Sequence, residues 1–144
     1  MSGLQNRAVF WQTYQHNIDG FLYWSPAHWV KSESYKGDVW KDGGEDYEHW
    51  GDGILLYPGC STKFAYEFRR IAPLPSIRLK IVRDGIEDYE LLKMAEEKFG
   101  RAWVDERINK VTPSLTEISV DDEGFDAIRR EIGNALSGAV TNGG

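Results

Sequence analysis

The run GFLYWSP, residues 20–26, constrains the fold of this sequence more than any other stretch. Apolar and aromatic side chains follow one another from Phe21 to Trp24 without a polar residue, and Ser25-Pro26 ends the run. A short, continuous apolar run that stops at turn residues is typical of a strand buried on both faces, as in a parallel sheet covered by helices. Such a strand needs neighbours on both sides, so we expect most of the sheet to lie upstream of this chain.

A helix is predicted immediately before this strand, at residues 6–17. Apolar side chains recur around it at helical spacing, namely Leu4, Ala8, Trp11 and Ile18. Asn6 can accept hydrogen bonds from the free backbone N–H groups of the first turn, and Gly20 ends the pattern. Trp11 lies on the apolar face and is expected in the core.

Aromatic residues are distributed unevenly along the chain. Fifteen of the nineteen lie between Phe10 and Phe68. Residues 27–53 are rich in Gly, Asp, Glu and Lys, yet they hold Trp29, Tyr35, Trp40, Tyr47 and Trp50. Disordered segments are poor in aromatic residues and long ordered loops are usually functional, so this segment is predicted to be a functional loop. The run ILLY at residues 54–57 is a second strand candidate.

Helices are predicted for most of the chain after Ala72. Apolar residues recur at helical spacing over residues 77–99, 102–111 and about 121–137. Pro75 suits the first turn of the first of these helices. Asp121 or Asp122 can cap the last helix, and Gly138 ends it.

The helix at residues 77–99 carries two apolar stripes and an internal glycine. One stripe consists of Leu79, Val82, Ile86 and Tyr89, and the other of Ile81, Leu92 and Ala95. Gly85 costs about 1 kcal/mol relative to alanine in a helix interior, so a packing reason for it is expected. The predicted fold class is therefore an α/β fragment that is mostly helical.

Composition argues against several classes of function. The net charge is −6 and the arginine pairs are isolated among acidic residues, so no basic stripe is available for nucleic acid. No apolar run approaches about 18 residues, so no membrane span is predicted. His16, His28 and His49 show no metal-ligand spacing, and Cys60 is predicted to be an inert thiol. We expect no metal and no cofactor.

Several motifs, taken in order, resemble one family. They are GFLYW at residues 20–24, the loop tryptophans, GDGILLYPG at residues 51–59, and PSIRL at residues 75–79 followed by RDGIEDYE at residues 83–90. From about Arg7 to Phe99 the chain resembles the domain of unknown function 4091, which closes the catalytic part of glycoside hydrolase family 123 and related proteins. Each motif alone is weak, and their shared order makes the resemblance specific.

The resemblance implies that the chain is the last part of a (β/α)₈ barrel enzyme. Residues 6–17 would be a late barrel helix and residues 21–25 the final strand. The aromatic loop would then form part of the active-site rim, because barrel active sites lie at the carboxyl ends of the strands. The expected segments are residues 1–72, with this helix, strand and loop, and residues 73–144, a C-terminal helical segment, packed as one compact unit.

Aromatic and polar side chains near that rim are the candidate sugar-binding residues. A sugar ring has an apolar C–H face that a flat indole can cover, and neighbouring polar groups can bind its hydroxyls. The candidates are Trp24, Trp29, Trp40, Asp52, His28 and Tyr57. The alternative for the rings is that they fill the core or seal the barrel end. Asp52 is equally suited to an Asx-turn that holds the loop.

Catalytic residues are not assigned to this chain. The resemblance implies a substrate-assisted mechanism, in which the sugar 2-acetamido group attacks its own anomeric carbon, an Asp orients that group and a Glu is the general acid. In the family this Asp-Glu pair precedes the matched region, so it is expected to be absent here. Glu87-Asp88 is predicted to be structural, with Glu87 paired to Arg83, and Glu45-Asp46 is predicted to lie in a solvated loop, with substrate contact still open.

The sequence thus predicts the C-terminal part of an N-acetylhexosaminidase-like glycoside hydrolase, inactive alone. Its expected partners are an N-acetylhexosamine-containing glycan and the upstream barrel portion of the same protein. The alternative is a non-catalytic module, either carbohydrate-binding or structural. The first residues lack the apolar stretch of a secretory signal, which leaves open whether the parent protein is secreted or periplasmic.

Overall fold

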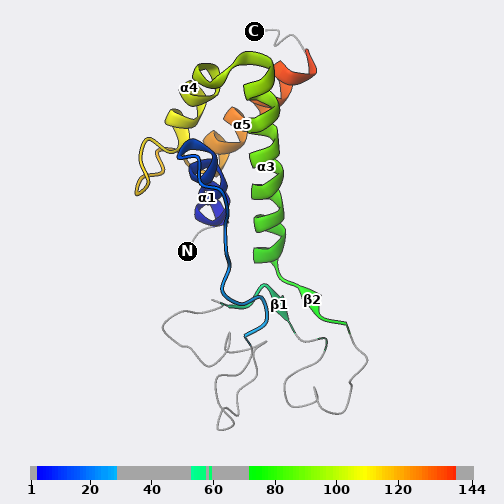
Figure 1. Ribbon diagram of the computed structural model, residues 1–144. Coiled ribbons are helices and arrows are strands. Elements are labelled where there is room, and N and C mark those ends of the chain that lie inside the picture. The colour runs from blue at the N-terminus through cyan, green and yellow to red at the C-terminus, as the bar shows by residue number, and fades with distance from the viewer. Residues whose placement is uncertain (1–2, 29–52, 58, 60–71, 139–144) are drawn as a thin grey trace. The chain divides into compact units, whose positions relative to one another are not determined.

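The computed structural model describes residues 3–28, 53–57, 59 and 72–138 (Figure 1). Contacts divide the chain into two units. The helical unit comprises Met1–Phe21 and Ile81–Gly144, and the strand unit comprises Leu22–Lys80. The described part of the chain is mostly helical, as the sequence predicts.

The helical unit packs its helices around one core (Figure 1). The elements are α1 (Gly3–Gln15), α3 (Ile77–Phe99, which enters this unit at Ile81), α4 (Arg101–Val111) and α5 (Asp122–Ser137). The buried residues of this core are Ala8, Trp11, Tyr14, Leu92, Ala95, Val104, Ile108, Val111, Phe125 and Ile132. Every helix contributes to this set, so each buries an apolar face against the others. The core position predicted for Trp11 is confirmed.

Helix limits follow local capping signals. The Asp121 carboxylate accepts a hydrogen bond from the Gly124 N–H at 2.9 Å and caps α5, whereas Gly138 ends that helix with φ 71°, in the left-handed region. Both predictions are confirmed. Gly100, with φ 84°, separates α3 from α4.

Two predictions about how helices begin were wrong, although the predicted range of α3 is confirmed. Helix α1 begins at Gly3, so Asn6 lies inside the helix and does not cap it. Pro75 belongs to a strand, and Ser76 performs the capping of α3 because its hydroxyl accepts a hydrogen bond from the Leu79 N–H at 3.2 Å. A serine oxygen satisfies a free N–H of the first turn directly, whereas a proline only lacks a donor there.

One of the two predicted stripes of α3 is its buried face. The fully or nearly fully buried positions of this helix are Gly85, Asp88, Leu92 and Ala95. Ile86, on the other stripe, is 50% exposed. Gly85 has the packing reason that the sequence suggested, because a Cβ atom there would overlap the ring of Phe10 from α1.

The strand unit is held together by short pairings between distant segments. Strand β1 (Leu56–Tyr57) pairs antiparallel with β2 (Leu74–Pro75), and Ala27 forms an isolated bridge with Ile54. The Pro26 carbonyl accepts hydrogen bonds from the Leu55 and Leu56 N–H groups at 2.8 and 2.9 Å. The strand predicted at residues 54–57 is thus present in its second half, with Ile54 bridged to Ala27.

The buried strand predicted at residues 21–25 is not found. These residues belong to no ladder, and Phe21 and Leu22 are 47% and 86% exposed. An apolar run becomes a buried strand only where neighbouring strands take its backbone hydrogen bonds and helices cover its faces. The described residues supply no paired strand for this run, and α1 contacts it through Phe10, whose ring packs on Phe21 with centroids 5.1 Å apart. They also contain no helix that is both long and apolar enough to cross a membrane.

Candidate functional site

The exposed indole of Trp24 is the central feature of the candidate site in the strand unit. Trp24 is 54% exposed, an unusual state for the largest apolar side chain. Its ring packs against the imidazole of His28, with centroids 4.8 Å apart and planes at 59°. The backbone of Gly53 lies against the indole on another side, close to Cζ2 and Cη2. The candidate site is therefore an indole that is supported from the protein side and open on another.

Hydrogen bonds to the backbone of Gly53 hold the segment that carries Trp24. The Gly53 N–H donates to the Tyr23 hydroxyl at 2.8 Å, and the Gly53 carbonyl accepts from the His28 N–H at 2.7 Å. Gly53 has φ 71°, a conformation that residues with a Cβ atom rarely adopt. One glycine thus joins the residue before Trp24 to the histidine that packs on it.

His28 lies more deeply than Trp24. Its Nε2 atom is buried and has no hydrogen-bond partner among the residues that the structure describes. Trp24 therefore presents more accessible ring surface to a ligand than His28 does.

The remaining predicted site residues are only partly placed. Tyr57 lies in β1, partly buried, in the same unit as Trp24 and His28. Trp29, Trp40 and Asp52 lie outside the described residues, as do Glu45, Asp46 and His49. The structure brings Trp24 and His28 into contact. The assignment of all six residues to sugar binding stays a prediction.

Tyr23 and Gly53 were not singled out from the sequence. Their signal is present only faintly, in the GDG triplet at residues 51–53, where a glycine after a turn residue suggests a positive φ. Nothing local to Tyr23 indicates a bond to a residue 30 positions away.

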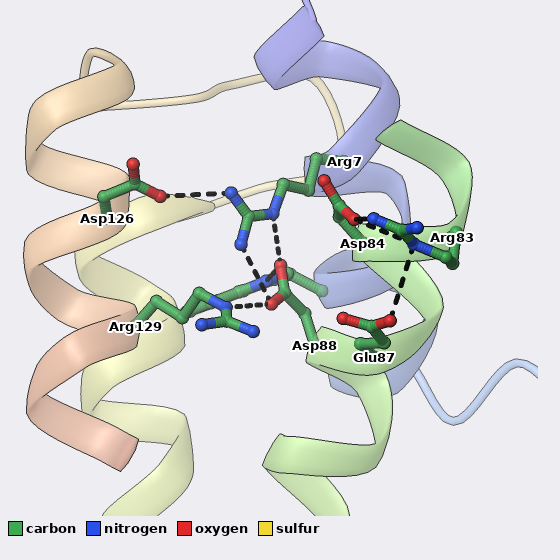
Figure 2. A network of polar contacts seen from close by, with 8 residues as sticks. Arg7, Arg83, Asp84, Glu87, Asp88, Asp126 and Arg129 are labelled. Atoms are coloured by element: carbon green, nitrogen blue, oxygen red, sulfur yellow. Dashed lines mark hydrogen bonds and ion pairs between the residues drawn. The ribbon is translucent and has the colours of Figure 1, made fainter. Parts of the chain in front are cut away.

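A buried ion-pair network centred on Asp88 occupies the helical unit (Figure 2). Asp88 of α3 is fully buried. Oδ2 accepts hydrogen bonds from Arg7 Nε at 2.6 Å and Trp11 Nε1 at 3.2 Å, and Oδ1 accepts from Arg7 Nη2 at 3.1 Å and Arg129 Nε at 2.5 Å. Arg7 also pairs with Asp126 at 3.0 Å. Helices α1, α3 and α5 are thereby joined at one carboxylate.

The network has the electrostatics of a structural site. Burial disfavours the charged form of Arg7, but the hydrogen bonds and charge of Asp88, with a further contribution from Asp126, outweigh that effect and raise the pKa of Arg7. A carboxylate offers about four lone-pair sites, and four donors fill those of Asp88. No acceptor position is left for a substrate proton, so Asp88 is not suited to general acid–base work.

Its sequence neighbour Glu87 lies on the solvent side of α3. Arg83 Nε is 3.5 Å from Glu87 Oε1, and both side chains are largely exposed (Figure 2). The predicted Arg83–Glu87 pair is confirmed. The two acids of this step therefore point to different environments, and they do not form a pair of cooperating carboxylates.

Among the described residues, no group of three or more His, Cys, Asp and Glu side chains could hold a metal ion.

No curated protein matches the chain at a significant level. The family model described as glycoside hydrolase 123, catalytic domain, matches residues 2–95. This stretch holds α1, the Trp24–His28 pair, Gly53 and most of α3, and it covers more than half of the sequence. The chain belongs to the glycoside hydrolase 123 catalytic-domain family.

Proposed function

We propose that this chain is the C-terminal part of a glycoside hydrolase that acts on N-acetylhexosamine-containing glycans, and that it supplies part of the sugar-binding wall. Within the family, the proposal takes it as a domain of unknown function 4091. Residues 1–72 would carry the last helix–strand unit of a (β/α)₈ barrel with its loop, and residues 73–144 the helical segment. Family membership supports a carbohydrate as the substrate class.

The observation that carries the proposal is the exposure of Trp24. Its indole is 54% accessible, while a glycine backbone and an imidazole support it from within the strand unit. A flat, held ring presents contact area to the C–H face of a pyranose and loses little conformational entropy on binding. Trp24 is therefore the principal platform in this proposal, with His28, Tyr57, Trp29, Trp40 and Asp52 as further wall residues.

The catalytic Asp-Glu pair is proposed to lie in the upstream barrel portion of the same protein. Asp88 is the one fully buried acid among the described residues, and its four donors leave it no free acceptor position, which supports this placement. The chain alone is then expected to bind sugar weakly and to hydrolyse nothing.

A second candidate is a non-catalytic structural module. The burial of Phe10, Trp11 and Tyr14 in α1 favours it, since these rings serve packing and contribute no accessible surface. Binding at Trp24 separates the two candidates, because a purely structural module has no reason to bind a sugar there.

A titration with N-acetylgalactosamine and N-acetylglucosamine tests the proposal. Labelled tryptophan indole N–H groups, followed by NMR in the full 144-residue chain, should show a saturable shift at Trp24 at millimolar sugar. Trp24→Ala should weaken affinity at least about tenfold, as expected for the loss of an aromatic anchor. Leu22→Ala is the matched control, because Leu22 is 86% exposed in the same segment and should leave affinity unchanged.

Two results would contradict the proposal. One is the absence of any saturable shift with either sugar. The other is an equal loss of affinity in Trp24→Ala and Leu22→Ala, since this would indicate a general disturbance of the segment.

A further inference from the structure

We propose that Gly53 and Tyr23 are positioning residues that fix the orientation of the Trp24 indole for sugar binding. This inference rests on the proposed function and deepens it. In this role Gly53 and Tyr23 hold the indole in its orientation and need not touch the ligand themselves.

The first step is the contact between Gly53 and Trp24. A Cβ atom at Gly53 would lie 2.6 Å from Cζ2 and 3.0 Å from Cη2 of Trp24, and 2.9 Å from Cβ of His28. Real Cβ atoms do not approach other atoms that closely, so the indole reaches its position only because residue 53 lacks a side chain. The φ of 71° at this residue imposes the same requirement independently.

The second step is the hydrogen bonding of Gly53. Its N–H donates to the Tyr23 hydroxyl at 2.8 Å, and its carbonyl accepts from the His28 N–H at 2.7 Å. Tyr23 and His28 bracket Trp24 in the sequence. Both backbone groups of Gly53 are therefore used to hold the segment that carries the indole.

The third step is the effect of a fixed indole on sugar affinity. A tryptophan at 54% exposure has solvent on one side and would sample other rotamers if its inner side were unsupported. Fixing such a ring before the ligand arrives removes an ordering cost from binding. Loosening it should lower sugar affinity even where the rest of the fold is unchanged.

Two variants test the inference in the full chain, with N-acetylgalactosamine as the probe. Gly53→Ala should displace the indole and reduce affinity by about tenfold or more, and Tyr23→Phe, which removes only the hydroxyl, should reduce it by about threefold to tenfold. Leu22→Ala is again the control that retains wild-type affinity. The thermal unfolding midpoint and the indole N–H resonance of Trp24 are recorded for each protein. Positioning predicts a shifted or broadened Trp24 resonance in the free variants, whereas Tyr23→Phe should keep the midpoint of the wild type.

The outcomes distinguish the two proposals. No sugar binding by the wild-type chain would overturn the proposed function, and with it this role for Gly53 and Tyr23. Wild-type binding with unchanged affinity in both variants would overturn the positioning role alone. Loss of affinity in Tyr23→Phe with an unchanged Trp24 resonance would also overturn it, because the hydroxyl would then act on the ligand directly.

Discussion

Arg7 of α1 donates hydrogen bonds to both carboxylate oxygens of Asp88 in α3, with Nε 2.6 Å from Oδ2 and Nη2 3.1 Å from Oδ1. The two residues lie 81 positions apart in the sequence. Arg129 of α5 and the indole N–H of Trp11 complete the set of donors. A carboxylate that is fully buried is stable only when its partners remain in place, so this contact fixes how three helices meet.

Asp88→Asn should therefore destabilise the helical unit by about 3 kcal/mol. The asparagine leaves Arg7 and Arg129 without their counter-charge and turns an amide group toward their donors. This loss in the free energy of unfolding is at the lower end of the range for broken buried ion pairs, because the side chains of Arg7 and Arg129 remain 19% and 36% exposed. Urea unfolding followed by circular dichroism measures it. Glu87→Gln is the adjacent control, and a loss of stability as large as that of Asp88→Asn would refute the special role of the buried acid.

Gly85→Ala should destabilise the protein, against the usual effect of this substitution in a helix. Alanine normally gains about 1 kcal/mol over glycine in a helix interior. At Gly85 the added methyl overlaps the Phe10 ring, and overpacking of this kind costs about 1–3 kcal/mol.

The matched control is Gly133→Ala in α5. A Cβ atom at Gly133 meets nothing within 4 Å, so the full propensity gain of about 1 kcal/mol should appear there. Thermal or urea unfolding of both variants should give shifts of opposite sign. Stabilisation by both substitutions would show that Phe10 can move aside.

The raised pKa of Tyr14 should make the protein less stable at alkaline pH. Burial raises the pKa of its phenol, and the nearby Glu96 carboxylate raises it further, while Arg101 opposes this. The hydroxyl has no hydrogen-bond partner among the residues that the structure describes.

The unfolded chain loses the Tyr14 proton at a lower pH than the folded chain does. In the unfolded chain Tyr14 ionises near pH 10, whereas in the folded chain it stays neutral at that pH. The folded state then binds more protons, and the free energy of unfolding falls as pH rises above about 10, by at most about 1.4 kcal/mol per pH unit. Tyr14→Phe should reduce this slope and leave stability at neutral pH nearly unchanged, because the buried hydroxyl has no partner within the part of the chain that the structure describes. Urea unfolding at a series of pH values measures both, and an unaltered alkaline slope in the variant would contradict the assignment.

Asp121→Ala should destabilise α5 by about 1 kcal/mol. The substitution removes the acceptor for the Gly124 N–H and leaves that group without its cap. Asp121→Asn keeps an oxygen acceptor at the same place and should retain most of the stability. Equal losses in the two variants would indicate that charge at the helix start, and not the hydrogen bond, is what Asp121 contributes.

The sequence alone determined the features that depend on a few neighbouring residues. Asp121 and Gly138 predicted the limits of α5, and the period of apolar residues predicted α3 with its bounds. The unusual Gly85 indicated a close contact, although its partner Phe10 could not be named. Capping, helix propensity and glycine conformation are set within about one turn of chain, so they can be read from a short window.

Only the tertiary structure decided which residues meet across the chain. The sequence predicted a structural role for the Glu87-Asp88 step but could not name the partners of Asp88, because Trp11, Arg7 and Arg129 lie 77, 81 and 41 residues away. The run at residues 21–25 has the composition of a buried strand, yet it belongs to no ladder, and Gly53 supports Trp24 although it lies 29 positions further along the sequence. Burial and pairing depend on what the rest of the fold brings alongside a residue, and no local pattern contains that information.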